Sequence, residues 1–204
     1  MIQLCSPDNV PVILASASPR RVALLDQIGL QADEIIPADI DESNLKTELP
    51  LPYAKRMAFE KTTAIAKLRP DAFVIGADTV VACGRRILPK ASDKQTAQEC
   101  LRLLMGRAHR VYGGIALYNP TTTKIMVKAT SSHVHMRRLD HKECDDYLHH
   151  GDWDGKAGGY AIQGAAAEFI TKIQGSYSQI MGLDIYLMAK LLKQAGFTKQ
   201  VRGK

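Results

Sequence analysis

Short apolar runs alternate with segments of helical periodicity along most of the chain. Residues 10–15 form an apolar run with β-branched side chains, and apolar residues then recur at helical spacing. This pattern predicts a strand, a turn of small residues, and a helix that begins at Pro19 and ends at Gly29, with Ser18 as its N-cap. The beginning of the chain therefore reads as a strand-turn-helix unit.

The rest of the sequence continues this alternation of elements. Helices are predicted over residues 53–67, from a Ser92–Gln95 capping box to about 104, from an Asp140–Glu143 capping box to about 150, and over about 183–194. The predicted strands are two short buried pieces around residues 76–78, a hairpin over 109–119 and 124–138, and a strand around 169–173. Helices interleaved with buried strands predict an α/β fold with a mixed central β-sheet and flanking helices. The basic residues 199–204 are expected to form a frayed tail.

Composition bounds the size of the fold and the class of partner. The 204 residues are 46% hydrophobic and 24% charged, which is ordinary for one globular domain spanning residues 1–204. The formal net charge of +6 favours anionic partners but does not separate a nucleotide from a nucleic acid or a membrane surface.

Cysteine spacing and hydropathy indicate the compartment. The four cysteines lie far apart with no paired spacing, which fits a reducing cytoplasm. No apolar run approaches the roughly 20 residues that a membrane-spanning helix needs. We therefore expect a cytoplasmic protein.

Arg20 and Arg21 occupy the first turn of the predicted N-terminal helix, the positive end of its macrodipole, where acidic residues are usual. Free backbone N–H groups, the dipole and two guanidinium groups together form an anion site suited to phosphate oxygens. The small residues 15–18 would let a ligand approach the backbone closely. For this segment alone, two solvated surface arginines are the alternative.

Asp78 emerges from an otherwise apolar run in the segment GADT, residues 76–79. Burying an unpaired carboxylate is costly, so this one must be hydrogen-bonded, paired or metal-bound. It is either a structural acid or a general base or metal ligand. Glu42, in the acidic segment DIDES, would join it around a hard cation such as Mg²⁺, or would simply lie in a polar loop.

The segment GKAGGYAIQG at residues 155–164 is rich in glycine. It matches neither a Walker A loop nor the dinucleotide-binding fingerprint. Such a loop lets the backbone approach a ligand, and it would present Lys156 together with Gln163, whose amide offers a donor and an acceptor to a base edge. An irregular turn without a ligand is the alternative.

These motifs, taken in their order along the chain, resemble those of a known protein family. The sequence contains SASPRR, the DE of DIDES, GADTVV, a lysine at residue 90, GRxHxV and GKAGGYAIQG in that order. In this combination the chain resembles the Maf family of nucleoside triphosphate pyrophosphatases over about residues 12–196. The IQG after GKAGGY resembles the branch that acts on dTTP and UTP. The resemblance implies an α/β fold with two lobes around a deep cleft, similar to the inosine triphosphate pyrophosphatases.

The resemblance also implies an activity and a role for each matching residue. The expected reaction is hydrolysis of a pyrimidine nucleoside triphosphate at the α–β phosphoanhydride, giving the monophosphate and pyrophosphate, with Mg²⁺ or Mn²⁺ as cofactor. Asp78 matches the proton acceptor, assisted by Lys90, and Glu42 with Asp78 would hold the metal. Positions matching those that set substrate choice are Arg20, Thr79 and Gln163. The other polar positions of the cleft match Ser16, Arg21, Lys61 and Lys156.

The expected chemistry suits these residue types. Water attack on a highly anionic tail needs charge neutralisation, which lysines, arginines and the metal supply, and a carboxylate to orient and deprotonate the water. The amide of Gln163 would pair with the O4 and N3–H edge of uracil or thymine and reject cytosine modestly. The expected partner is a small-molecule nucleotide, with no nucleic acid and no membrane; a homodimer is left open.

Three positions depart from the family pattern. Ala91 replaces a proline after Lys90, which we expect to make that loop less rigid. Gly113 replaces a threonine, and Asp184 stands where the family has proline, near a predicted helix start where an acid is a harmless N-cap.

Other functions are left open by the sequence. A pyrophosphatase for a purine or modified nucleotide shares every motif. A non-catalytic nucleotide-binding inhibitor of septum formation would not need the intact Asp78, Lys90 and Glu42. Nucleic-acid binding through the positive charge ranks last, because no platform of interleaved aromatic and basic residues is present.

Overall fold

The computed structural model describes residues 2–201. Its helices are α1 (Pro19–Gln27), α2 (Pro50–Leu68), α3 (Lys94–Leu104), α4 (His141–His150), α5 (Tyr177–Met181) and α6 (Ile185–Gln194), with 3₁₀ turns η1 (Pro7–Asn9) and η2 (Ala165–Phe169). Its strands are β1 (Ile2–Cys5), β2 (Val12–Leu14), β3 (Glu34–Ile35), β4 (Phe73–Cys83), β5 (Arg86–Ile87), β6 (Lys90–Ala91), β7 (Arg107–Asn119), β8 (Lys124–Met136), β9 (Lys156–Ala157), β10 (Ile170–Gln174) and β11 (Thr198–Val201).

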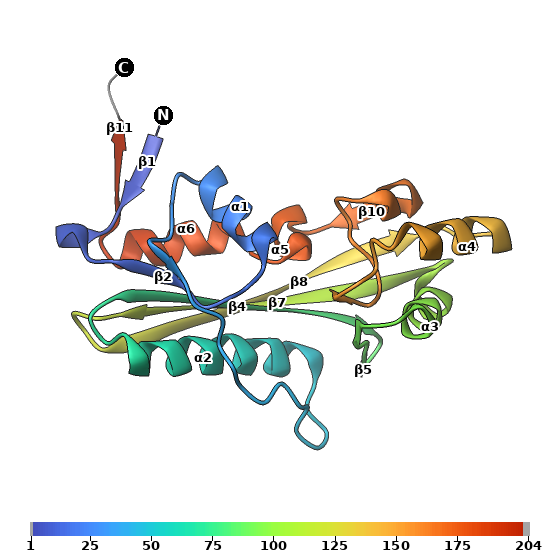
Figure 1. Cartoon of the computed structure of the whole chain (residues 1–204), viewed down its shortest axis with the longest axis horizontal. Coiled ribbons are helices and arrows are strands. Elements are labelled where there is room, and N and C mark those ends of the chain that lie inside the picture. The colour runs from blue at the N-terminus through green and yellow to red at the C-terminus, as the bar shows by residue number, and fades with distance from the viewer. Residues whose placement is uncertain (1, 202–204) are drawn as a thin grey trace.

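The centre of the fold is a seven-stranded mixed sheet in the order β10-β8-β7-β4-β2-β3, with β5 beside β4. The pairs β2–β3 and β2–β4 are parallel, and the other pairs are antiparallel. Helix α2 covers one face of this sheet, while α1, α5 and α6 cover the other; α3 and α4 lie at one end (Figure 1). This confirms the expected α/β fold with a mixed sheet and flanking helices.

Strand β4 differs from the two short pieces that the sequence predicts. It is one strand of eleven residues, paired continuously with β7 from Val74 to Ala82. Gly76 does not break it because backbone pairing with a neighbouring strand continues through the glycine. Asp78 therefore lies within a regular strand, between flanking residues that point to the opposite face of the sheet.

One edge of β4 is left open in its middle. Strand β2 pairs with β4 only as far as Ile75, and β5 joins the same strand at Ala82. The chain leaves β2 at this point and turns into α1, which begins at Pro19. The gap along residues 76–80 is where the cleft opens into the sheet.

Two glycines bring α2 close to the sheet. A Cβ on Gly76 would lie 2.1 Å from Oγ1 of Thr62, and one on Gly114 would lie 2.0 Å from the carbonyl oxygen of Ala54. Both distances are shorter than real Cβ atoms show, so only glycine permits this packing. The close approach places Lys61, on α2, beside the open edge of β4.

The buried side chains gather on both sides of the cleft. One cluster joins α3 and α4 to β7 and includes Leu101, Leu104 and Phe169. A second cluster joins α1 and α6 to β2, β4 and β7 and includes Leu24 and Met188. The long strands β4 and β7 run through both clusters, so the two lobes share one sheet.

Helix ends differ from the sequence prediction at two places. Ser18 occupies the N-cap position of α1, but its side chain makes no capping bond. Helix α3 is capped by Asp93, which accepts from the Thr96 amide, so the predicted Ser92–Gln95 box is wrong. The helix predicted over about 183–194 is confirmed as α6, which Asp184 caps as expected for an acid there. The short helix α5, which Gly182 ends, precedes it and has no counterpart in the prediction. The Asp140–Glu143 capping box is confirmed.

The basic C-terminal segment is wrongly predicted as frayed within the described residues. Residues 198–201 form β11, which pairs antiparallel with β1. The remainder of the predicted tail, residues 202–204, lies outside the described residues. None of the helices within residues 2–201 is both long enough and apolar enough to cross a membrane.

Candidate active site

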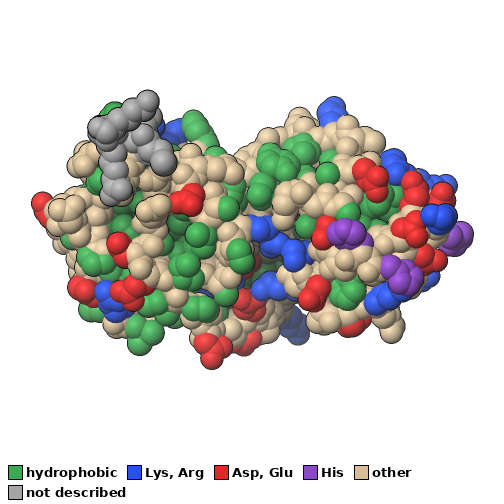
Figure 2. All heavy atoms as spheres, turned by 45° about the horizontal axis from the view of Figure 1, so that its top comes forward, with side chains coloured by type: hydrophobic (Ala, Val, Ile, Leu, Met, Phe, Trp, Pro, Cys, Tyr) green, Lys and Arg blue, Asp and Glu red, His purple; other side chains and the backbone are tan. Residues whose placement is uncertain are grey.

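All ten residues that the sequence singles out line one cavity of about 430 Å³. It opens between the two lobes, where blue lysine and arginine side chains gather in the hollow (Figure 2). The ten residues come from six separate parts of the chain: Ser16, Arg20, Arg21, Glu42, Lys61, Asp78, Thr79, Lys90, Lys156 and Gln163. Five cations against two carboxylates give the cavity a formal charge of +3, suited to a polyanion.

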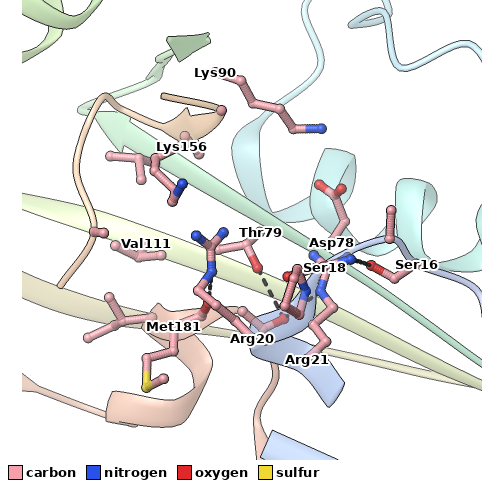
Figure 3. A pocket seen from close by; sticks show the side chains of 18 of the residues that line it. Ser16, Ser18, Arg20, Arg21, Asp78, Thr79, Lys90, Val111, Lys156 and Met181 are labelled. Carbon is pink, nitrogen blue, oxygen red and sulfur yellow. Dashed lines mark hydrogen bonds between the residues drawn. The ribbon is translucent and has the colours of Figure 1, made fainter. Parts of the chain in front are cut away.

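Arg20 and Arg21 extend from the first turn of α1 to the end of α5. Nε of Arg20 donates to the carbonyl of Met181 at 3.2 Å, and Nε of Arg21 donates to the carbonyl of Gly182 at 3.0 Å (Figure 3). These carbonyls lie at the negative end of a helix, which offsets the repulsion at the positive end of α1. Burial lowers the pKa of both guanidinium groups. The arginines are therefore fixed in place and are not freely solvated.

Ser16 links the arginine pair to the turn before α1. Its Oγ accepts from Nη1 of Arg21 at 2.7 Å and from the backbone N–H of Ser18 at 3.3 Å. Ser16 thus orders the small-residue turn in place of the predicted Ser18 cap. The side chain of Thr79 reaches the same point from the sheet and donates to the Gly182 carbonyl at 3.3 Å.

Lys61 joins the two carboxylates of the cavity. Its ammonium lies 2.7 Å from Oδ1 of Asp78 and 2.7 Å from Oε1 of Glu42. Lys61 and Asp78 are almost fully buried, whereas the side chain of Glu42 is 37% exposed. Asp78 is therefore a paired acid in a partly dry site, which explains how a carboxylate can stand in an apolar strand.

Lys90 approaches Glu42 from the opposite wall. Its ammonium lies 2.6 Å from Oε2, and the lysine side chain is 55% exposed. Burial alone would raise the pKa of Glu42, but hydrogen bonds from Lys61 and Lys90 outweigh it and lower the pKa to about 2. Lys90 and Ala91 form β6, which pairs antiparallel with β9, so the backbone beside Lys90 is hydrogen-bonded although the family's proline is absent.

Two carboxylates of the cavity are the candidate ligands for a hard cation. Within residues 2–201 no three His, Cys, Asp or Glu side chains gather as a metal site. Glu42 and Asp78 supply two carboxylates at one point, and Mg²⁺ is commonly held by one or two carboxylates together with substrate phosphates. The donors present are those expected for a metal that arrives with a phosphate ligand.

The glycine-rich segment 155–164 forms the opposite wall. Its β9 pairs with β6, and the amide of Gly158 donates to the Pro89 carbonyl at 2.9 Å. Lys156 and Gln163 both line the cavity, at the two ends of this wall. Apolar side chains also line the cavity: Val81, Val111, Ile162, Ile180 and Met181.

Comparison with known proteins matches the chain to a family. The Maf-like protein family model covers residues 11–195, nearly the whole chain. The chain belongs to the Maf family.

Three relatives of this Maf chain carry the name dTTP/UTP pyrophosphatase. The relative from Paramagnetospirillum magneticum is 54% identical over 186 residues, which is 91% of this chain and 97% of the relative. The relative from Rhodospirillum rubrum is 50% identical over 187 residues, 92% of this chain and 89% of the relative. The relative from Caulobacter vibrioides is 47% identical over 186 residues, 91% and 96% respectively.

Some residues that shape the Maf site give no sequence signal. The carbonyls of Met181 and Gly182 orient both arginines, but any residue type carries a carbonyl. Tyr53 donates to the Glu42 carbonyl at 2.6 Å and so fixes the loop that carries this glutamate. The sequence places Tyr53 in a predicted helix, but it does not predict the contact with Glu42, because Glu42 lies in an irregular loop.

Proposed function

We propose that this Maf-family chain hydrolyses dTTP and UTP to the nucleoside monophosphate and pyrophosphate. The names of its relatives support the substrate and the reaction. One observation carries the proposal: the buried carboxylate of Asp78 is paired with Lys61 in a cavity that other cationic side chains also line. A phosphoanhydride can be held there beside a carboxylate base.

The cations would bind the triphosphate. Arg21 and Ser16 offer donors beside the N-terminus of α1, and Lys156 and Lys90 face them across the cavity. Nε of each arginine is bonded to a carbonyl, and Nη1 of Arg21 is bonded to Ser16. The terminal nitrogens of Arg20 and Nη2 of Arg21 remain for phosphate oxygens. Because phosphoryl-type transfer is accelerated mainly by positioning and charge stabilisation, these groups would supply much of the catalysis.

Asp78 would orient the attacking water and take its proton. The Lys61 ammonium holds this carboxylate at the open edge of β4, next to the phosphate-binding side chains. General-base catalysis of this kind contributes about 10²–10⁴-fold to a rate. The side chain of Lys90 is half exposed. When substrate binds, its ammonium would leave Glu42, contact the phosphate oxygens and stabilise the negative charge that develops on them.

Glu42 and Asp78 would hold the divalent metal that the family suggests, Mg²⁺ or Mn²⁺. When bound, such a cation neutralises phosphate charge and lowers the pKa of coordinated water. Lys61, bridging the same two carboxylates, keeps them in place in the free enzyme.

The nucleobase of the substrate would lie between the glycine-rich segment and Arg20. The apolar side chains of the cavity suit a flat ring, and Gln163 offers an amide to the O4 and N3–H edge of uracil or thymine. Arg20 and Thr79, both tied to the end of α5, would fix the shape of this part of the cavity and so contribute to substrate choice.

The setting of the reaction is also proposed. We expect residues 1–204 to act as one domain on a small-molecule nucleotide, without nucleic acid or membrane, in the cytoplasm. The cysteines Cys5, Cys83, Cys100 and Cys144 are free thiols, which fits a reducing compartment. Cell fractionation and size-exclusion chromatography test the location and the open choice of a homodimer.

The direct test is a panel of nucleoside triphosphates with Mg²⁺ or Mn²⁺ and separation of the products. We expect pyrophosphate with UMP or dTMP, and slower turnover of CTP, ATP and GTP. Release of orthophosphate, or no turnover of any pyrimidine triphosphate, would falsify the proposal. Preferred turnover of a purine or modified nucleotide would keep the reaction and replace the substrate.

A further inference from the structure

His109 and Tyr160 form a buried polar pair beside the cavity. Nε2 of His109 lies 2.7 Å from the hydroxyl oxygen of Tyr160, and the rings meet edge to face with centroids 5.4 Å apart. Both residues are nearly inaccessible, at 3% and 6% exposed. The hydrogen bond is therefore shielded from water, and losing it would leave a buried polar group unpaired.

The two partners belong to different parts of the fold. His109 lies on the long central strand β7, opposite Val134 of β8. Tyr160 lies in segment 155–164, between Lys156 and Gln163, and it lines the cavity. The bond thus ties a wall of the cavity to the sheet.

Segment 155–164 has little regular structure to hold it. Gly158 and Gly159 both have a φ of +69°, and Cβ atoms there would lie 2.7 Å from Val81 and 3.1 Å from Ala97. These glycines let the segment lie close to β4 and α3, but they also leave its backbone intrinsically free. Side-chain anchors must then fix its conformation.

The anchors are distributed unevenly along the segment. Near Lys156, the amide of Gly155 donates to the Ala91 carbonyl at 2.7 Å, and β9 pairs with β6. Toward Gln163, the anchors are side chains: the Tyr160–His109 bond, Tyr147, whose hydroxyl donates to the Gly159 carbonyl at 3.3 Å, and Asp152, which accepts from the Ala165 amide at 2.7 Å. Loss of the Tyr160 bond should therefore affect Gln163 more than Lys156.

Both members of the pair are neutral near neutral pH. Burial, with a smaller contribution from His135, lowers the pKa of His109 to about 4. Burial also raises the pKa of Tyr160 above its ordinary value. The tautomer of the imidazole sets which group donates, and the hydrogen bond persists throughout the physiological range.

We propose that His109 is a positioning residue that, through the hydroxyl of Tyr160, fixes the segment carrying Gln163 and thereby sets selection of the base. The proposal rests on the pyrophosphatase function proposed above. His109 does not line the cavity, so it acts through Tyr160 and not on the substrate.

The test compares variants that remove the hydroxyl of Tyr160 or the imidazole of His109. Tyr160→Phe and His109→Leu each remove the bond, whereas His109→Gln keeps an amide that can reach the hydroxyl. Tyr118→Phe is the matched control, because Tyr118 is 7% exposed and donates to the Pro70 carbonyl at 3.3 Å, outside the cavity. Hydrogen exchange over residues 155–164 reports the anchoring without any turnover.

We expect faster exchange in residues 155–164 for Tyr160→Phe and His109→Leu, and wild-type exchange there for Tyr118→Phe. The KM for UTP should rise about 3- to 10-fold, the loss expected from one buried hydrogen bond, with kcat within about twofold. Preference for UTP over CTP should fall, and His109→Gln should restore most of both. A merely structural role would instead lower the amount of active enzyme and leave KM unchanged.

Two results would overturn the inference: exchange in residues 155–164 that Tyr160→Phe leaves unchanged, or a KM for Tyr160→Phe that equals that of Tyr118→Phe. Failure of His109→Gln to restore KM when His109→Leu raises it would also count against it. If the wild-type chain turns over no pyrimidine triphosphate, the proposed function fails, while hydrogen exchange still decides whether the anchor exists.

Discussion

Lys61 and Asp78 form an ion pair of 2.7 Å between α2 and the open edge of β4, and both side chains are almost fully buried. The same ammonium reaches Glu42, so one cation balances two acids. The pair can form because Gly76 on β4 and Gly114 on β7 let α2 lie close to the sheet. The glycines that let α2 pack closely on the sheet therefore also place the ammonium of Lys61 beside the carboxylate of Asp78.

Replacing Asp78 tests its role as the proton acceptor. Asp78→Asn keeps the shape of the side chain but cannot accept a proton, so kcat should fall about 10²–10⁴-fold, while UTP still binds. Turnover measured with isothermal titration of UTP separates the two effects. Asp71→Asn is the control, because Asp71 is an exposed acid outside the cavity. Activity near that of the wild type would rule out the proton-acceptor role.

Removing Lys61 should destabilise the fold as well as reduce activity. In Lys61→Met, Asp78 would be a buried charge without its partner, and the free energy of unfolding should fall by about 2–4 kcal/mol at pH 7. Urea unfolding measures the loss. Because the cause is the unpaired acid, adding Asp78→Asn should recover part of it. A double variant no more stable than Lys61→Met would contradict this explanation.

Two adjacent glycines on β7 should respond differently to the same change. In Gly114→Ala the new methyl would meet the Ala54 carbonyl of α2, a backbone atom, so we expect a loss of about 3 kcal/mol or more. In Gly113→Ala it would meet only the side chain of Gln179, which can move, so the loss should be about 1 kcal/mol. Urea unfolding of both variants compares them. Equal losses would show that α2 can shift away from the sheet.

His109 should make stability depend on pH. The buried neutral imidazole has a pKa of about 4, below its ordinary 6.5, so the unfolded chain binds a proton that the folded chain does not. Stability is therefore fully present above pH 6.5 and is lost as pH falls toward 4, by up to about 1.4 kcal/mol per pH unit.

The titration is isolated by comparing the wild type with His109→Gln. The difference between their urea unfolding free energies should change between pH 7 and pH 4.5, and remain constant between pH 7 and pH 8. His135, on the adjacent strand, is the other titratable group that acts on His109, so His135→Gln serves as a control for its smaller contribution. A constant difference over the whole range would mean that His109 does not titrate with a lowered pKa.

Local patterns in the sequence suffice for much of the fold. Apolar periodicity predicts α1, the long α2 and the β7–β8 hairpin, and local capping predicts the start of α4. These features depend on residues close in sequence. The continuous strand β4 and the pairing of β11 with β1 depend on partners that are distant in the sequence, on β7 for β4 and at the other end of the chain for β1. These partners supply hydrogen bonds that no local pattern reveals.

The side chains suited to the chemistry can be picked out from the amino-acid sequence, because a carboxylate in an apolar strand, two arginines at a helix start and a glycine-rich loop each conflict with ordinary structural preferences. How these side chains meet depends on the folded chain. It bonds Arg20 and Arg21 to the carbonyls at the end of α5, joins Asp78 and Glu42 through Lys61, and ties Tyr160 to His109. Those relationships are set by the close packing of α2 and α5 on opposite faces of one sheet, which brings together residues far apart along the chain.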